Sequence, residues 1–125
     1  MPGVRLLGTQ MNSQEFDKCI EMLRSSDSLT YEDGYHWLQG CLDKYIDELV
    51  QLMLRETDPN MRSKFVELVG NSKNPKVIPL LEAELKSHHS EVRSWAYSSL
   101  LYFENSEAMK IAECFRKENP NDDFL

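Results

Sequence analysis

The chain has 125 residues, 41% of them hydrophobic, and this length suits one domain with its own buried core. Its 21 acidic and 14 basic residues give a net charge of −7, which opposes binding to the phosphates of DNA or RNA. No apolar run is long enough for a membrane span or a secretion signal, so we expect a cytoplasmic protein that does not bind membranes.

The first two predicted helices lie near the start of the chain. Asn12 and Glu15 have the spacing of a capping box, which opens a helix that we expect to reach about residue 25. A second helix is predicted over about 29–39, where Gly40 stops it. Gly34 lies inside this helix and lowers its helix propensity by about 1 kcal/mol relative to alanine.

The next two predicted helices have stronger signals. The third covers about 42–56, because its apolar residues recur at the spacing of one buried helix face. These residues are Ile46, Leu49, Val50, Met53 and Leu54. The fourth follows Asp58, whose carboxylate can cap free amides, begins at Pro59 and ends at Gly70.

Three further helices complete the prediction. The fifth opens at Asn74 and Pro75, and its inward residues are Val77, Leu80, Leu81 and Leu85. The sixth covers about 90–104 and follows an exposed turn at His88 and His89, while the seventh covers about 107–117. We expect one helical domain over 12–118, a loose N-terminal segment over 1–11 and a loose acidic C-terminus over 119–125.

These helices fall into pairs that repeat with a period of about 31 residues, a length typical of helical repeats. At this offset Leu38 aligns with Val69 and Leu100. Because one helix pair cannot bury its apolar face alone, such a repeat is typical of pairs that stack on one another. The sequence therefore predicts an all-α fold of about seven helices, in which three pairs are followed by a capping helix.

Two segments resemble the Asp-Pro-x-Val-Arg turn of HEAT and armadillo-like repeats. They are Asp58-Pro59-Asn60-Met61-Arg62 and Ser90-Glu91-Val92-Arg93. Segment 77–81 is similar to the start of the family's first helix, and segment 27–31 is a weaker copy of the turn. The resemblance implies a short right-handed α-solenoid that binds other proteins, in which Arg62 and Arg93 bond to acids of neighbouring repeats.

In this family the second helix of each pair usually carries the binding surface, which points here to 29–39, 59–70 and 90–104. Helical spacing gives the inward positions as Trp37, Leu38, Met61, Phe65, Leu68, Val69, Val92, Ala96, Leu100 and Phe103. The outward positions form three columns, where a column is a set of residues that align at the repeat offset. These columns are Tyr35, Val66 and Tyr97; His36, Glu67 and Ser98; and Asp33, Lys64 and Trp95.

Tyrosine and tryptophan are favoured interface anchors because they bury a large area and keep one polar atom. We therefore predict a partner-binding site formed by Glu32, Tyr35, Glu67, Trp95, Tyr97, Tyr102 and Glu104. The alternative is that Trp95 lies between repeats and the tyrosines are half-buried core residues.

The sequence offers little for catalysis or metal binding. It lacks a Gly-rich phosphate loop, a Gly-x-Ser-x-Gly nucleophile motif and a Cys-x-x-Cys pair, so we expect no enzyme activity and no cofactor. The three cysteines, Cys19, Cys41 and Cys114, are widely spaced and are predicted to be free buried thiols. His88 and His89 would diverge by about 100° on a helix, which disfavours chelation of a metal.

Glu84 departs from the apolar pattern, since it aligns with Met53 and Phe115 at the repeat offset. Carboxylates on these helices are generally expected on solvated faces, but a carboxylate in an apolar column indicates contact with a partner.

The function that we expect is binding and inhibition of another protein. Small acidic solenoids resemble bacterial immunity proteins, so the expected partner is a toxin domain with a basic, nuclease-like cleft. We expect this chain to be a monomer or to form a 1:1 complex with that partner. The alternative is a scaffold or adaptor within a longer array. Polar outer faces on the first and last helices predict capped ends, which favours a stand-alone protein over the array.

Overall fold

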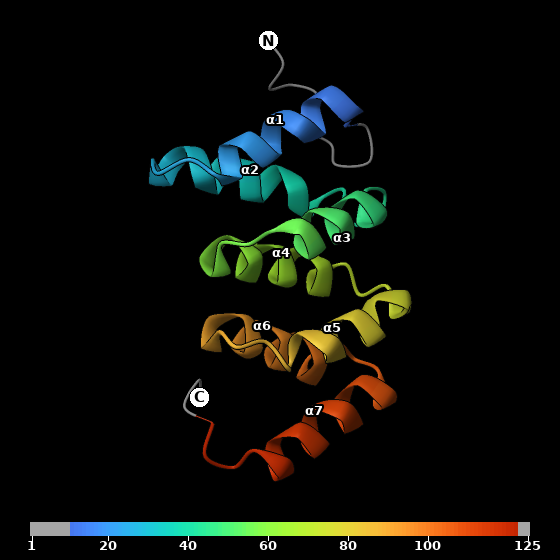
Figure 1. The fold of residues 1–125 in the computed structure, drawn as a ribbon. Helices are drawn as coiled ribbons and strands as arrows, with labels where there is room; N and C mark the ends of the chain where they lie inside the picture. The colour runs from blue at the N-terminus through green and yellow to red at the C-terminus, as the bar shows by residue number, and fades with distance from the viewer. Residues whose placement is uncertain (1–10, 123–125) are drawn as a thin grey trace. The chain divides into compact units, whose positions relative to one another are not determined.

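The computed structural model describes residues 11–122, and this part of the chain contains seven α-helices, one short 3₁₀ helix and no strand (Figure 1). The predicted all-α fold class is confirmed. Contacts divide the chain into two compact units, unit 1 up to Tyr45 and unit 2 from Ile46. The predictions for residues 1–10 and 123–125 lie outside the described residues, and the single domain over 12–118 stays a prediction.

Unit 1 contains the helix pair α1 (Ser13–Leu23) and α2 (Ser28–Gln39). The predicted capping box is present: the Glu15 amide donates to Asn12 Oδ1 at 2.8 Å, and the Asn12 amide donates to Glu15 Oε1 at 2.9 Å. The two helices pack against each other at Gly34, where an added Cβ would lie 2.8 Å from the Cβ of Met22. Close packing of α1 against α2 therefore explains a glycine that helix propensity alone disfavours.

Residues 41–45 form turns, so the prediction that the third helix begins at Leu42 is wrong. The Tyr45 ring stacks on Phe16 with centroids 4.4 Å apart, and its hydroxyl donates to the Met11 carbonyl at 2.8 Å. Lys44 Nζ donates to the same carbonyl at 2.9 Å. These contacts hold the segment against α1 and leave α3 to begin at Ile46.

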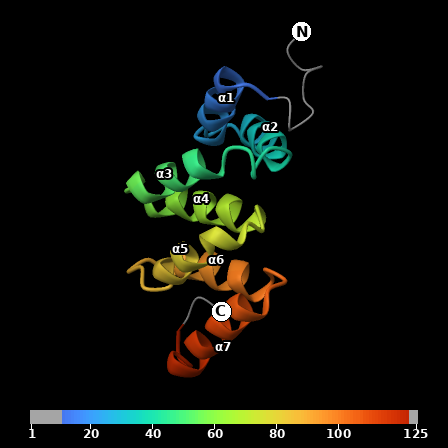
Figure 2. The same ribbon diagram turned by 90° about the vertical axis from the view of Figure 1, so that its right-hand side faces the viewer.

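Unit 2 contains the remaining helices. They are α3 (Ile46–Arg55), α4 (Pro59–Asn71), η3 (Pro75–Val77), α5 (Ile78–Glu84), α6 (Ser90–Leu101) and α7 (Ser106–Glu118). Helix α4 packs along α6, and α3, α5 and α7 pack against these two helices (Figure 2). The second helices of the two pairs thus form one layer, with the first helices and α7 against it.

The period found in the sequence is also present in the backbone. Helices α2, α4 and α6 begin at Ser28, Pro59 and Ser90, which are evenly spaced at the repeat offset. The only described non-glycine residues with positive φ are Lys73 (56°) and Glu104 (65°), and they too are one repeat apart. Because a left-handed residue cannot continue a right-handed helix, each ends the turn that follows its helix.

Two other predicted boundaries differ from the structure. Helix α6 ends at Leu101 instead of near Glu104, because Tyr102 and Glu104 leave helical backbone geometry. The fifth helix begins with the 3₁₀ turn η3, in which Asn74 Oδ1 accepts from the Lys76 amide at 3.0 Å, and only then continues as α5.

The core agrees with the predicted inward positions, with three exceptions. Phe65, Leu68, Val69, Val92, Ala96 and Leu100 are fully buried. Trp37 and Leu80 are half-buried, and Leu54, placed on the buried face of the third helix, is 45% exposed. Leu54 lies about 90° around α3 from the centre of the face that holds Leu49 and Met53, so it flanks the core instead of entering it.

Candidate functional site

Helix α6 presents one outward stripe of side chains. Glu91, Trp95 and Ser98 follow the i, i+4, i+7 spacing that places residues on one side of a helix, and Tyr102, the C-cap residue, continues this series at i+11. Trp95 is 40% exposed and Tyr102 is 67% exposed, although both are large and largely apolar. Two exposed aromatic side chains therefore lie about two turns apart, or roughly 10 Å, along this stripe.

The neighbouring helix α4 carries the matching stripe. At the repeat offset its residues are Asn60, Lys64, Glu67 and Asn71, all exposed or half-buried. We call these two stripes together the α4–α6 face. Of the predicted site residues it contains Glu67, Trp95 and Tyr102. It also contains Lys64, which the sequence placed in one column with Trp95, and Glu91, which lies about one helical turn before Trp95.

The end of α6 is built so that Tyr102 points away from the core. The next residue, Phe103, is 3% exposed and fills the interior. Lys73 Nζ donates to the Tyr102 carbonyl and lies 5.8 Å from the centre of the Phe103 ring. With its backbone held on one side and its neighbour buried on the other, Tyr102 keeps its ring in solvent, and Glu104 follows it as an exposed carboxylate.

One predicted outward column is wrong for α4 and α6. Val66 is completely buried, and the Tyr97 ring lies 6.3 Å from the Phe115 ring of α7. The column that holds Val66 and Tyr97 therefore points toward the following helices. Tyr97 is half-buried in this contact, which separates it from the α4–α6 face.

The two predicted site residues of unit 1 lie on α2. Glu32 is exposed, whereas Tyr35 is half-buried and its ring lies 6.0 Å from the ring of Tyr31. The α2 positions that correspond by offset to the α4–α6 face are Leu29, Asp33, His36 and Gly40, and all four are exposed. Glu32 and Tyr35 thus occupy other columns of the repeat.

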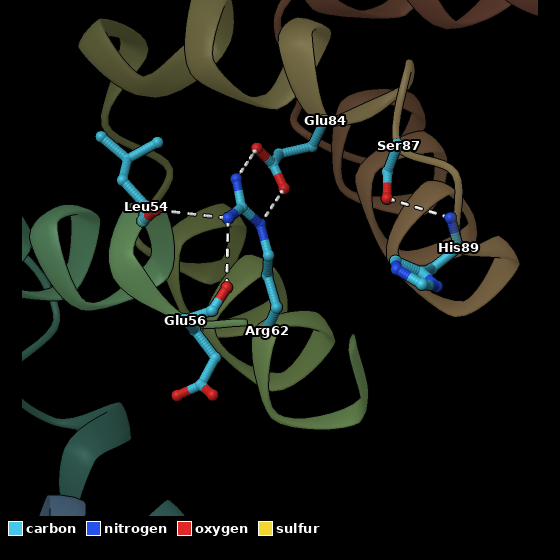
Figure 3. A network of polar contacts seen from close by, with 6 residues as sticks. All are labelled: Leu54, Glu56, Arg62, Glu84, Ser87 and His89. Carbon is cyan, nitrogen blue, oxygen red and sulfur yellow. Dashed lines mark hydrogen bonds and ion pairs between the residues drawn. The ribbon is translucent and has the colours of Figure 1, made fainter. Parts of the chain in front are cut away.

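Glu84 does not face a partner, so that interpretation is wrong. Its carboxylate is 6% exposed and accepts from Arg62 Nε at 2.8 Å and Nη2 at 2.7 Å. Figure 3 shows Arg62 reaching toward Glu84 on one side and the carbonyls of Leu54 and Glu56 on the other. Hydrogen bonding to Glu84 is the main cause that raises the pKa of Arg62, against the opposing effect of burial.

The Arg62 network therefore has a structural role. The guanidinium joins α4 to α5. It also donates to the Leu54 carbonyl in the last turn of α3 and to the Glu56 carbonyl just after that helix, which no amide of α3 can reach. This is the bond to a neighbouring acid that the family resemblance implied for Arg62.

The cysteines lie in two environments. Cys19 and Cys41 are buried, and burial raises the pKa of the Cys41 thiol to about 11, with a further contribution from Cys19 and an opposing one from Lys44. Burial also raises the pKa of Cys19. Cys114 is exposed, so the prediction of a buried thiol is wrong at that position.

Within residues 11–122, no three His, Cys, Asp or Glu side chains are grouped as a metal would require. No helix in the same range has the length and apolar character needed to cross a membrane. A hollow of about 320 Å³ lies against α5 and α7, with Leu85, Ile111 and Phe115 among its lining residues. It lacks a convergent set of groups for chemistry, so the α4–α6 face remains the stronger candidate.

Comparison with known proteins identifies one family. The family model for HEAT repeats matches residues 46–123, which includes all the described residues of unit 2. Searches of curated proteins and of solved structures gave no match. The matched segment contains both turn motifs, the Arg62 network and the α4–α6 face.

Proposed function

The chain belongs to the HEAT-repeat family, a generally non-catalytic group whose repeats act in protein binding or scaffolding, and from this premise we propose that the α4–α6 face is its partner-binding surface. The observation that carries this proposal is the pair Trp95 and Tyr102, exposed on one side of α6. Aromatic side chains of this kind supply most of the binding energy in many interfaces, because they lose little rotamer freedom when they are buried.

We further propose that the partner has a basic surface. The net charge of −7 creates a field that attracts positive proteins, and Glu67, Glu91 and Glu104 lie on or beside the α4–α6 face. Lys64 and Lys73 in the same region add donors that can select a particular arrangement of acids and bases in the partner.

A bacterial toxin domain with a basic, nuclease-like cleft fits these requirements. Such a cleft is positive because it binds phosphate groups, so an acidic surface carrying two aromatic anchors can compete with nucleic acid for it. Occlusion of the cleft is sufficient for inhibition, and the proposal requires no chemistry from this chain. The protein would then act as an immunity protein, in a 1:1 complex with the toxin domain.

The test uses a purified basic nuclease domain encoded beside the gene for this chain. Trp95→Ala and Tyr102→Ala are each expected to weaken binding by at least about tenfold, because each removes an exposed anchor. Their melting temperatures should stay close to that of the original protein, since neither side chain is in the core.

Matched controls come from the other side of the same unit. Leu54 and Met109 are 45% and 41% exposed, close to the 40% of Trp95, but they lie on α3 and α7. Alanine at either position should leave affinity unchanged. Tyr97→Ala should instead lower the melting temperature, because its ring packs against Phe115. Equal losses of affinity at Leu54 and Trp95 would refute the assignment to the α4–α6 face, and absence of any complex would refute the toxin proposal.

A further inference from the structure

Two arginines occupy the same position of successive repeats and make the same backbone contact. Arg62 Nη1 donates to the Glu56 carbonyl at 3.2 Å, and Arg93 Nη1 donates to the Ser87 carbonyl at 3.0 Å. In both cases the carbonyl lies six residues before the arginine. The contact fixes each guanidinium at the start of α4 or α6. Its remaining donors, Nε and Nη2, then point toward residues that follow that helix in the chain.

The carboxylates that meet these donors come from different places. Arg62 binds Glu84, which is on α5, the first helix of the next pair. The residue that corresponds to Glu84 one repeat later is Phe115, which has no carboxylate. Helix α7 therefore cannot supply an acid to Arg93 from that position.

Asp122 supplies the acid instead. Its Oδ2 accepts from Arg93 Nε at 2.9 Å and its Oδ1 from Nη2 at 3.1 Å, so the pairing is as fully bidentate as that of Arg62 with Glu84. The side chains of Arg93 and Asp122 are only 20% and 9% exposed. An ion pair this well shielded differs from the exposed pair of Lys76 and Asp47, whose carboxylate side chain is 80% exposed.

The chain reaches this position by folding back after α7. The Asn119 amide and side chain both donate to the Phe115 carbonyl, and the Asp122 amide donates to the Asn119 carbonyl at 3.2 Å. Segment 118–122 and Arg93 line a polar hollow of about 460 Å³. The segment thus bridges the end of α7 and the beginning of α6.

We propose that Arg93 is a carboxylate-binding site, equivalent to the one that Glu84 fills at Arg62, and that Asp122 is its internal ligand. Segment 119–122 then acts as a strap that closes this end of unit 2 where α7 lacks the required acid. The strap also holds the first turn of α6, on which Glu91 begins the stripe of the α4–α6 face.

Chemical rescue tests this proposal on the full chain. Asp122→Ala should lower the melting temperature by at least about 4 °C, because it leaves the shielded Arg93 without its acid. Sodium formate, a free carboxylate, should restore part of this loss when it is compared with sodium chloride at the same ionic strength. The double variant Arg93→Gln with Asp122→Ala should show no formate-specific recovery.

Asp47→Ala is the matched control, because it removes a carboxylate paired with Lys76 at a similarly short distance of 2.7 Å but in solvent. It should change the melting temperature by less than about 2 °C and should not respond to formate. A response to formate that is equal in all variants would overturn the proposal.

Hydrogen exchange gives a second measurement that needs only a mild change. In Asp122→Asn, the backbone amides of residues 119 and 122 should exchange at least about tenfold faster, because the strap opens more often. Unchanged exchange at both amides would mean that the Arg93 contact does not hold the strap, and would also overturn the proposal.

Discussion

At the scale of single residues, the turns before α2, α4 and α6 share one hydrogen bond at the N-cap, but only the first two also have a side-chain cap. The N-cap amides of Asp27, Asp58 and His89 each donate to a side chain two residues earlier, namely Ser25, Glu56 and Ser87. The carboxylates of Asp27 and Asp58 then accept from the Thr30 and Met61 amides. His89 makes no such bond, so the first turn of α6 lacks the cap that the other two helices have.

Replacement of this histidine should therefore stabilise the protein. His89→Asp is expected to add about 1 kcal/mol to the free energy of unfolding, because it supplies an acceptor and a negative charge at a helix N-terminus. Chemical denaturation at neutral pH measures this change. His88→Asp makes the same change of charge one residue before the cap and serves as the control. If both variants gain equally, the effect comes from net charge and the capping explanation is wrong.

At the scale of helices, packing of α4 on α6 depends on a missing side chain. A Cβ added at Gly70 would lie 2.2 Å from Ser99 Oγ and 2.5 Å from Ser99 Cβ, closer than atoms can approach. The two helices are in contact at this point because one contributes no side chain and the other a small one. This contact sets the distance between the two stripes of the α4–α6 face.

Gly70→Ala should consequently destabilise unit 2 although alanine favours helix formation. We expect a loss of about 1–3 kcal/mol in the free energy of unfolding, since overpacking outweighs the propensity gain of about 1 kcal/mol. The double variant Gly70→Ala with Ser99→Gly should recover part of this loss, because it removes the Ser99 side chain that the new Cβ at position 70 would meet. A double variant less stable than the sum of both single changes would contradict this packing explanation.

At the scale of the whole molecule, the proposed function assigns the rate of encounter with the partner to charge and the retention of the partner to the aromatic residues. The excess of acidic residues is spread along the chain and gives the net charge of −7. Long-range attraction of a basic partner raises the association rate, and dissolved ions screen it within about 10 Å at 0.1 M salt. Loss of Trp95 or Tyr102 should instead act on the dissociation rate.

Rapid-mixing kinetics at several salt concentrations can separate the two effects. With the basic nuclease domain as partner, the association rate should fall by about tenfold or more as salt rises from low to physiological concentration, while the dissociation rate changes little. The Trp95→Ala variant should show the same slope of association rate against salt as the original protein. An association rate independent of salt would remove the argument for a basic partner.

The helices, their order and their period could be predicted from the sequence alone. These follow from local chemistry, namely the caps at Asn12, Asp58 and Asn74 and the apolar spacing along each helix, so they can be found without knowledge of distant contacts. The same period predicted that Glu67 and Trp95 lie in outward columns, and the α4–α6 face contains both of them together with Tyr102. Whether they bind a partner stays a prediction.

The covered sides of the helices and the paired charges could be found only once the packed helices were known. Val66 and Tyr97 occupy one column, but neighbouring helices bury the first completely and cover the second in part. By composition, Glu84 and Asp122 do not differ from other acidic residues. Yet each forms an ion pair with an arginine that lies more than twenty residues away in the chain. Helical periodicity gives the direction of a side chain around its own axis, whereas burial and ion pairing depend on what another segment places opposite it.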